Sequence, residues 1–197
     1  MKIQIAVPTY ENIFPDVFKA IYDMDKGGHE VLFDTVRGYD CATARNNCAR
    51  IAMKNDADFL LMIDNDVRVK SDALVNLLDD VRDVTLGYYK HRDPNNPYVN
   101  KTSICKLGQV NYTWQYTSEE VRDLRESGQY KVEIHGGGLG CALIKVDVFR
   151  KMTFPYFDWL NYENGQMLSE DLYFCEHCRI VQKLRQVLVY TTIGNSC

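Results

Sequence analysis

The sequence predicts an α/β fold with a mostly parallel central sheet, helices on both of its faces and a mixed C-terminal half. Short apolar runs alternate with amphipathic helical stretches up to about residue 90, at the spacing of strand–helix–strand crossover units. Beyond residue 90 this regular alternation is lost. A chain of 197 residues suits one domain, 1–197, that can bury a continuous core.

In the first half, apolar periodicity defines the elements, and turn residues define their ends. Pro8 is expected to end the first strand, and Gly27 with Gly28 to end the first helix. Thr43 is the expected cap of the second helix. The predicted strands are 3–7, 29–33, 59–63 and 85–89; the predicted helices are 16–26, a helix from Thr43 that buries Ala44, Cys48, Ile51 and Ala52, and a helix from Ser71 that buries Leu74, Leu77, Leu78 and Val81.

The second half mixes helices and strands. Residues 91–97 are rich in turn formers, and 103–116 suit a hairpin or an irregular excursion, where a lid or an acceptor loop would lie. Thr117 and Glu120 have the spacing of a capping box, which starts a helix that ends at Gly128. The remaining predictions are strands at 130–134, 141–146 and 187–192 and a helix at 172–184.

Composition limits the possible partners. The formal net charge is -4, and the lysines and arginines are scattered, which argues against a nucleic-acid partner. No apolar run reaches the ~20 residues of a membrane span, and residues 1–8 are too short for a signal peptide, so we expect no integral membrane segment and a cytoplasmic location. Seven cysteines suit free thiols in a reducing compartment. Cys175 and Cys178 lie within a predicted helix and lack a second ligand pair, which argues against a zinc or redox motif.

Asp64 and Asp66 follow the apolar run 59–63 directly and are separated by one residue. In extended backbone, side chains two residues apart point the same way, so these carboxylates can converge on one cation. Oxygen ligands suit Mg²⁺ or Mn²⁺, and such ions commonly bind phosphate groups. The pattern therefore favours a metal–diphosphate site; the alternative is an acidic turn that only ends the strand.

Three further features allow chemistry. The glycine run 136–140 precedes a strand rather than a helix, so it is no dinucleotide fingerprint; it is either backbone that a bulky ligand can approach or a tight turn. Glu170 and Asp171 follow Ser169 at a helix start, which suits either capping or a fixed general base. Arg45 lies in a first helical turn, where the helix dipole disfavours a cation, so it is expected to face an anion or a carboxylate, or to be an ordinary exposed or ion-paired arginine.

In chain order, five segments form a set that resembles the GT-A (Rossmann-like) glycosyltransferases, most of all the inverting, family-two-like group. They are Val7-Pro-Thr-Tyr-Glu11, Ala42-Thr-Ala-Arg-Asn46, Leu61-Met-Ile-Asp-Asn-Asp66, Gly136-Gly-Gly-Leu-Gly140 with Ala142-Leu-Ile144, and Ser169-Glu-Asp171. The resemblance extends from Val7 to about Glu176. It implies a sugar transferase that uses a nucleotide-diphospho-sugar, UDP- or GDP-linked, and a hydroxyl acceptor whose identity the motifs leave open.

The resemblance also implies roles for individual residues. Residues 1–90 would be the nucleotide-binding half and 91–197 the acceptor-binding half. Asp64 and Asp66 would hold Mn²⁺ or Mg²⁺, and Asp171, in preference to Glu170, would be the catalytic base. The donor would contact Pro8, Thr9, Tyr10 and Glu11, with Asp34 or Arg37 near the base, Arg45 near the diphosphate or base, and Asn65 near the ribose or sugar; Gly137, Gly138 and Trp159 would border the acceptor.

One departure and two rival functions accompany this hypothesis. Many relatives carry a further metal-binding histidine downstream, but no histidine follows His177 here. Either Asn195, water or a diphosphate oxygen fills that position, or the natural C-terminus is altered or lost. The rivals are a nucleotidyltransferase, although residues 8–12 lack the expected phosphate loop, and a non-catalytic nucleotide-sugar binding module.

Overall fold

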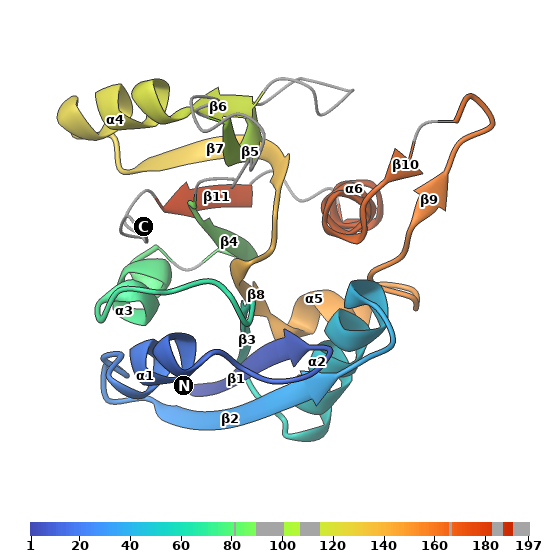
Figure 1. The fold of residues 1–197 in the computed structure, drawn as a ribbon, viewed down its shortest axis with the longest axis horizontal. Coiled ribbons are helices and arrows are strands. Elements are labelled where there is room, and N and C mark those ends of the chain that lie inside the picture. Colours follow the sequence, from blue (N-terminus) through green and yellow to red (C-terminus); the bar gives the residue numbers. More distant parts are fainter. Residues whose placement is uncertain (81, 90–100, 107–114, 166, 183–186, 191–197) are drawn as a thin grey trace.

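One mixed sheet joins the two halves of the protein in a computed structural model that describes residues 1–80, 82–89, 101–106, 115–165, 167–182 and 187–190 (Figure 1). Within these residues the sheet has nine strands in the order β2-β1-β3-β8-β4-β11-β7-β5-β6. Their bounds are Lys2–Thr9 (β1), Glu30–Arg37 (β2), Phe59–Ile63 (β3), Val84–Gly87 (β4), Lys101–Lys106 (β5), Gln115–Thr117 (β6), Lys131–Gly137 (β7), Cys141–Lys145 (β8) and Val187–Tyr190 (β11).

The strand directions confirm a mostly parallel sheet. β1 pairs in parallel with β2 and β3, and β4 pairs in parallel with β11. β8 lies between β3 and β4 and is antiparallel to both, so β3 and β4 themselves run the same way. Together with β5, these strands point in one direction, whereas β6, β7 and β8 point in the other.

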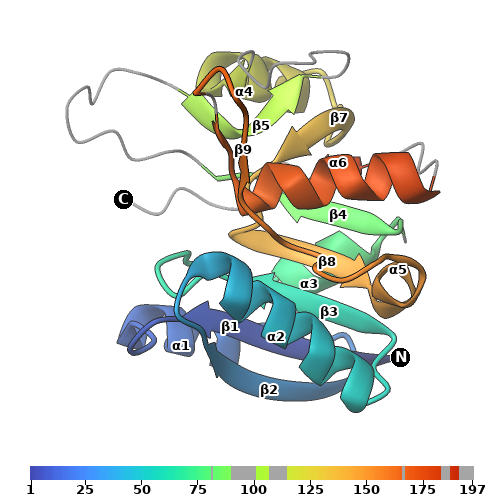
Figure 2. The same ribbon diagram turned by 90° about the vertical axis from the view of Figure 1, so that its right-hand side faces the viewer.

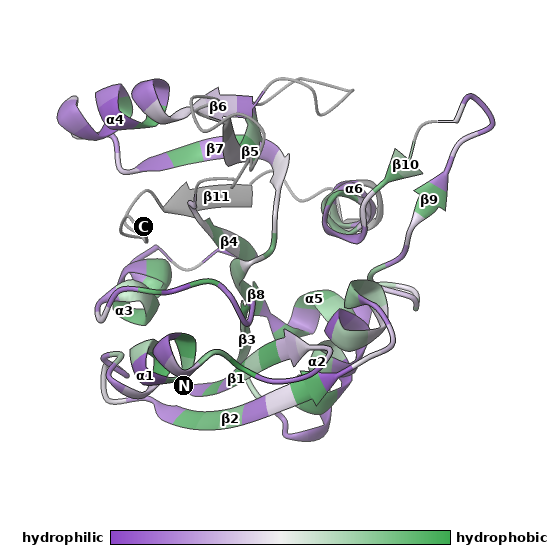
Figure 3. Ribbon diagram, viewed as in Figure 1, coloured by the Kyte–Doolittle hydropathy of each residue, from purple (hydrophilic) through white to green (hydrophobic). Residues whose placement is uncertain are grey.

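Helices cover both faces of the sheet, as predicted. Helices α1 (Pro15–Tyr22) and α3 (Ala73–Leu78) pack on one face, against Ile3, Ile5 and Leu61. Helices α2 (Cys41–Lys54), α5 (Val146–Lys151) and α6 (Glu170–Gln182) pack on the other face, which Figure 2 turns toward the viewer. Helix α4 (Ser118–Glu126) lies beyond β6, and a small hairpin of β9 (Leu160–Asn161) and β10 (Met167–Leu168) stands beside α6. The hydrophobic middle of the sheet, β3 and β8, is green in Figure 3.

Several boundaries in the first half differ from the prediction, including β4, which is Val84–Gly87 rather than 85–89, and α3, which begins at Ala73 rather than Ser71. β1 continues through Pro8 to Thr9, where it still pairs with β2. Its pairing with β3 ends at Ala6, so the proline lies in a part of the strand that has a neighbour on one side only, where a missing N–H is tolerated. Helix α1 ends at Tyr22, since the Lys26 ammonium donates to the carbonyls of Ile21, Tyr22 and Met24. Helix α2 begins at Cys41, and its cap is Asp40 rather than Thr43.

The Asp40 carboxylate accepts a hydrogen bond from the Thr43 amide at 2.7 Å, which places the cap three residues before the threonine. Strand β2 is also longer than predicted, at Glu30–Arg37, and β3 has the predicted bounds. The predicted inward residue Val81 lies outside the described residues, as do the turn-rich segment 91–97 and the end of the last predicted strand.

The second half agrees with the prediction in part: α4, β7, β8 and α6 form close to the predicted places, whereas helix α5 and the β9–β10 hairpin were not predicted. The Thr117 hydroxyl accepts from the Glu120 amide at 3.2 Å, and the Glu120 carboxylate accepts from the Thr117 amide at 2.9 Å, so the capping box is confirmed. β5 and β6 pair as an antiparallel hairpin around residues 107–114, which lie outside the described part. No helix in the described part of the chain has the length and apolar character needed to cross a bilayer.

A buried asparagine joins α2 to the chain that leads into α6. The Asn46 side-chain amide donates to the carbonyls of Ala42 at 2.9 Å and Phe157 at 2.7 Å. Its oxygen accepts from the amides of Tyr156 at 2.9 Å and Phe157 at 3.3 Å. Phe157 in turn stacks on Phe174 of α6, with ring centroids 4.7 Å apart. Asn46 therefore fixes the distance between α2 and α6, the two helices that meet at the site described below.

Replacing Asn46 tests this link. Asn46→Ala is expected to lower the free energy of unfolding by about 3 kcal/mol, because buried amide and carbonyl groups of the 156–157 segment lose their partners. Asn47→Ala is the matched control, since its single bond of 3.5 Å to the Arg37 carbonyl predicts a loss below ~1 kcal/mol. Urea unfolding of both variants measures the difference; equal losses would contradict the role given to Asn46.

Candidate functional site

A cavity of about 470 Å³ opens at the carboxyl ends of β1 and β3, beside the start of α2. Open α/β sheets generally bind ligands at this edge, where the loops after parallel strands meet. Its lining residues come from the ends of β1, β2 and β3 and from the first turns of α2. They are Pro8, Thr9, Tyr10, Gly38, Tyr39, Asp40, Cys41, Ala44, Arg45, Asp64, Asn65 and Asp66.

The cavity gathers most of the residues predicted to bind donor or metal. Pro8, Thr9, Tyr10, Arg45, Asp64, Asn65 and Asp66 all line it. Glu11, Asp34 and Arg37 do not: the Arg37 guanidinium donates to the Glu11 carbonyl at 3.1 Å, and the Asp34 carboxylate accepts from the Gln4 side-chain amide at 3.0 Å. The predicted donor contacts of these three residues stay predictions.

Sequence reasoning missed the loop 38–41 and Ala44, which form one wall of the cavity. A Cβ at Gly38 would lie 2.4 Å from the Ala44 backbone nitrogen, so only glycine allows the loop to pack this closely on α2. The available signal was a glycine at the end of a strand, followed by a capping aspartate. That combination places a loop at the same sheet edge as Pro8 and Asp64.

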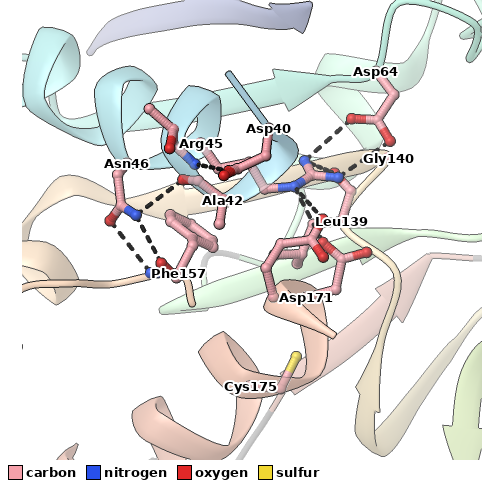
Figure 4. A network of polar contacts seen from close by, with 12 residues as sticks. Asp40, Ala42, Arg45, Asn46, Asp64, Leu139, Gly140, Phe157, Asp171 and Cys175 are labelled. Carbon is pink, nitrogen blue, oxygen red and sulfur yellow. Dashed lines mark hydrogen bonds and ion pairs between the residues drawn. The ribbon is translucent and has the colours of Figure 1, made fainter. Parts of the chain in front are cut away.

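Arg45 is the centre of the site (Figure 4). Its side chain is only 4% exposed and faces three carboxylates from two other segments. Two guanidinium nitrogens contact the two oxygens of Asp64 at 3.1 and 3.2 Å. The Nε atom lies 3.1 Å from Oδ1 of Asp171 and 3.5 Å from Oε1 of Glu170. Nη1, one of the two nitrogens that contact Asp64, also donates to the Leu139 carbonyl at 3.4 Å, so one side chain joins α2, the end of β3, the glycine run and α6.

The charges in this cluster change the pKa values of its members. Burial by itself lowers the pKa of Arg45, but the surrounding carboxylates outweigh it and hold that pKa well above the ordinary value. Burial raises the pKa of the Asp171 carboxyl to about 6; Arg45 opposes this rise, and Glu170 and Asp64 add to it. One cation thus faces three acids, and Asp171 is the acid that titrates near neutral pH.

The glycine run packs against protein rather than against open space. A Cβ at Gly138 would lie 2.3 Å from the Tyr89 hydroxyl oxygen, and one at Gly140 would lie 2.9 Å from it. The Gly140 amide donates to that hydroxyl at 3.2 Å, and a Cβ at Gly137 would lie 2.7 Å from the Ser103 carbonyl. These contacts hold Leu139 where its carbonyl meets Arg45. The acceptor contacts predicted for Gly137 and Gly138 remain predictions.

The β9–β10 hairpin leads directly into the start of α6, and its first strand follows Trp159. The Trp159 side chain is 39% exposed. Cys175 and Cys178 are buried on α6, and burial raises the pKa of both thiols, Cys175 to about 12. Among the described residues, no three or more histidine, cysteine, aspartate or glutamate side chains are grouped so as to hold a metal ion.

Comparison with known proteins identifies structural neighbours only. No protein-family model matches the sequence, and no curated protein sequence matches it either. A197 from STIV superposes with a TM-score of 0.61 at 17% identity, over 98% of this chain and 83% of that chain. S. aureus TarS 1-349 in complex with UDP superposes with a TM-score of 0.53 at 14% identity, over 98% of this chain and 59% of that chain. These likenesses agree with the predicted α/β, Rossmann-like fold.

Removing the central cation should destabilise the protein. Arg45→Met is expected to lower the free energy of unfolding by about 3 to 5 kcal/mol, because three largely buried carboxylates lose their counterion. The double variant Arg45→Met/Asp171→Asn should regain part of the lost free energy of unfolding, since a neutral amide then replaces one of the three carboxylates. Arg50→Met, on the exposed side of α2, is the control and should change the value by less than ~0.5 kcal/mol. Urea unfolding distinguishes these outcomes. Equal effects of Arg45→Met and Arg50→Met would show that the ion-pair cluster around Arg45 does not stabilise the fold.

The raised pKa of Asp171 predicts a pH-dependent stability difference. The folded protein binds the Asp171 proton more tightly than the unfolded chain, with a pKa of about 6 against 3.8, so stability falls as pH rises through this interval and then levels off. Asp171→Asn lacks this loss and should be more stable than wild type by about 3 kcal/mol well above pH 6, with no difference below pH ~4. Unfolding at pH 4 and pH 7 tests this, with exposed Glu163→Gln as control; a variant less stable at pH 7 would contradict it.

Proposed function

We propose that the protein is a metal-dependent glycosyltransferase that moves a sugar, with inversion, from a UDP- or GDP-linked donor to a hydroxyl acceptor. One observation carries the proposal: Arg45 joins Asp64, the first acid of the Asp-x-Asp pair, to Asp171, the acid expected to be the base. These two acids lie far apart in the sequence, and each belongs to a different motif of the family resemblance. Asp64 and Arg45 line the ligand-sized cavity, and Asp171 lies directly behind them in contact with Arg45, which supports a common task.

The cavity suits a nucleotide at its mouth. Tyr10 and Tyr39 line it with side chains that are 73% and 94% exposed, and such aromatic faces suit stacking on a nucleobase. Asn65 donates to the Thr9 hydroxyl at 3.3 Å and to the Asn12 carbonyl at 3.1 Å, which orders the wall between them. The UDP complex of TarS, which shares the fold, supports a uridine nucleotide as the first donor to test.

The charges of the cavity favour a cation beside the diphosphate. Asp40, Asp64 and Asp66 line it, and the charge of Arg45 is already balanced by carboxylates. A diphosphate would therefore be repelled unless Mn²⁺ or Mg²⁺ enters with it. Mg²⁺ is commonly held by one or two carboxylates plus substrate phosphates, so Asp64 and Asp66 suffice as protein ligands. When bound, the ion would stabilise the charge that develops on the departing nucleotide.

Asp171 suits the role of general base. With a pKa of about 6, its carboxyl is mostly ionised at pH 7 and still basic enough to take a proton from an attacking hydroxyl. Arg45 holds it at one oxygen, and its place in the first turn of α6 fixes its direction. Glu170 is more deeply buried against Arg45 and would position that arginine rather than react. Trp159, beside the hairpin that precedes α6, would offer an aromatic face to the acceptor sugar.

Nucleotide binding is the first half of the test. Wild-type protein with Mn²⁺ is expected to bind UDP or GDP, and Asp66→Asn should weaken this binding by about tenfold because one metal ligand loses its charge. Exposed Asp72→Asn changes the net charge equally and should bind as wild type does. Calorimetric titrations with Mn²⁺ and with EDTA measure both effects. Equal nucleotide affinity in all three proteins would contradict the assignment of Asp66 as a metal ligand.

Turnover is the second half. Wild-type protein should release UDP or GDP from one member of a nucleotide-sugar panel, and the rate should rise with pH through about 6 as Asp171 loses its proton. Asp171→Asn should lose at least about a hundredfold in rate while keeping nucleotide affinity, and Glu163→Gln should be unchanged. Tight binding without turnover would favour a binding module. Pyrophosphate release from a nucleoside triphosphate and a sugar phosphate would favour a nucleotidyltransferase.

A further inference from the structure

A second cavity lies along the last turns of α2, next to the proposed nucleotide site. It measures about 520 Å³ and runs between α2 and β2, the outermost strand on this side of the sheet (Figure 2). Its lining residues are Thr35, Val36, Arg37, Asn47, Arg50, Ile51 and Lys54. None of them lines the first cavity, but Arg37 precedes Gly38 in the chain, so the two cavities are neighbours.

The charge of this second cavity is entirely positive. Arg37, Arg50 and Lys54 line it, and no aspartate or glutamate does. Within the described part of the chain none of these three side chains forms an ion pair, whereas Lys19, Lys131, Lys145 and Arg150 each meet a carboxylate within 2.9 Å. The nearby Asp34 carboxylate is held by Gln4. The protein has a net charge of -4, so a groove whose charged lining residues are all basic differs from the rest of the molecule.

The places of these basic residues in α2 and β2 explain why they border the same groove. Asn47, Arg50, Ile51 and Lys54 recur at the helical spacing of three and four residues, which places them on one face of α2. Arg37 comes from a different element, the end of β2, and borders α2 through its backbone, whose carbonyl accepts from the Asn47 side-chain amide at 3.5 Å. Its guanidinium lies on the other face of β2 from Val36 and donates to the Glu11 carbonyl at 3.1 Å. Thr35 and Asn47 add a hydroxyl and an amide that can donate hydrogen bonds.

We propose that this groove binds a ligand with two or more phosphate groups, independently of the nucleotide cavity. An arginine fork and a lysine ammonium bind phosphate oxygens with charge-assisted hydrogen bonds, and Arg50 and Lys54, one helical turn apart, can contact more than one phosphate group. The nucleotide cavity, lined by aspartates, repels such a ligand when no metal is present. Without divalent cations, the two cavities therefore have opposite preferences. The proposal does not depend on glycosyl transfer.

Binding of inorganic tripolyphosphate in EDTA tests the proposal. Wild-type protein is expected to bind it at least about tenfold more tightly than orthophosphate, because several phosphate groups meet several cations. The double variant Arg50→Gln/Lys54→Gln should lose about tenfold in tripolyphosphate affinity. Arg122→Gln/Arg125→Gln, on the exposed face of α4, removes the same charge from another helix and should lose less than about twofold. Calorimetry gives all four affinities.

Three results would overturn the proposal. They are no tripolyphosphate binding by the wild type, equal affinity for tripolyphosphate and orthophosphate, and equal losses in the two double variants, which would indicate non-specific attraction. Binding of UDP with Mn²⁺ is the control for folding, and both double variants should keep it. If Arg50→Gln/Lys54→Gln lost it as well, the groove would be part of the nucleotide site rather than a separate one. If the wild type bound no UDP but still bound tripolyphosphate, the proposed function alone would fail.

Discussion

The structure of the site depends on one buried positive charge. A guanidinium that is 4% exposed is tolerated only when carboxylates or carbonyls surround it, because an unpaired buried charge costs several kcal/mol. Arg45 therefore requires the end of β3, the glycine run and the start of α6 to meet at α2. Asn46, the next residue, binds the segment that leads toward α6 and so fixes its distance from α2. The fold positions its candidate catalytic acids through contacts that exist before any ligand arrives, which is the condition for electrostatic preorganisation.

The same cluster carries a cost for stability. Three acids around one arginine leave an excess of negative charge. The raised pKa of Asp171 means that its ionised form is less favourable in the folded protein than in the unfolded chain. A core optimised for stability would not place a third carboxylate there. Such local losses are common where a site needs a reactive group, and the buried apolar strand β3 on the other side of Asp64 offsets them.

Local pattern explains what the sequence could predict. The alternation of strands and helices, the five buried residues of β3 and the capping box at Thr117 all follow from residues close together in the chain. Arg45 does face carboxylates, as predicted, but the reason given for it was wrong. Because α2 begins at Cys41, Arg45 lies in the second turn of the helix, beyond the first turn where the helix dipole disfavours a cation. Long-range pairing was not predictable: nothing near residues 141–145 shows that β8 inserts antiparallel between β3 and β4. Likewise, the packing of the glycine run on Tyr89 joins residues 51 positions apart, and no local signal indicates it.

Helix α2 divides the protein's surface into two electrostatic environments. Its first turns contribute Asp40, Cys41 and Ala44 to the acidic cavity, and its last turns contribute Arg50 and Lys54 to the basic groove. Because side chains on one helix face recur every three to four residues, a single helix can serve both cavities without either set of charges neutralising the other. Arg45 is the one basic residue of α2 that turns toward the acids, and it is also the buried one. The acidic cavity at the start of α2 and the basic groove along its last turns thus differ in the charges that line them.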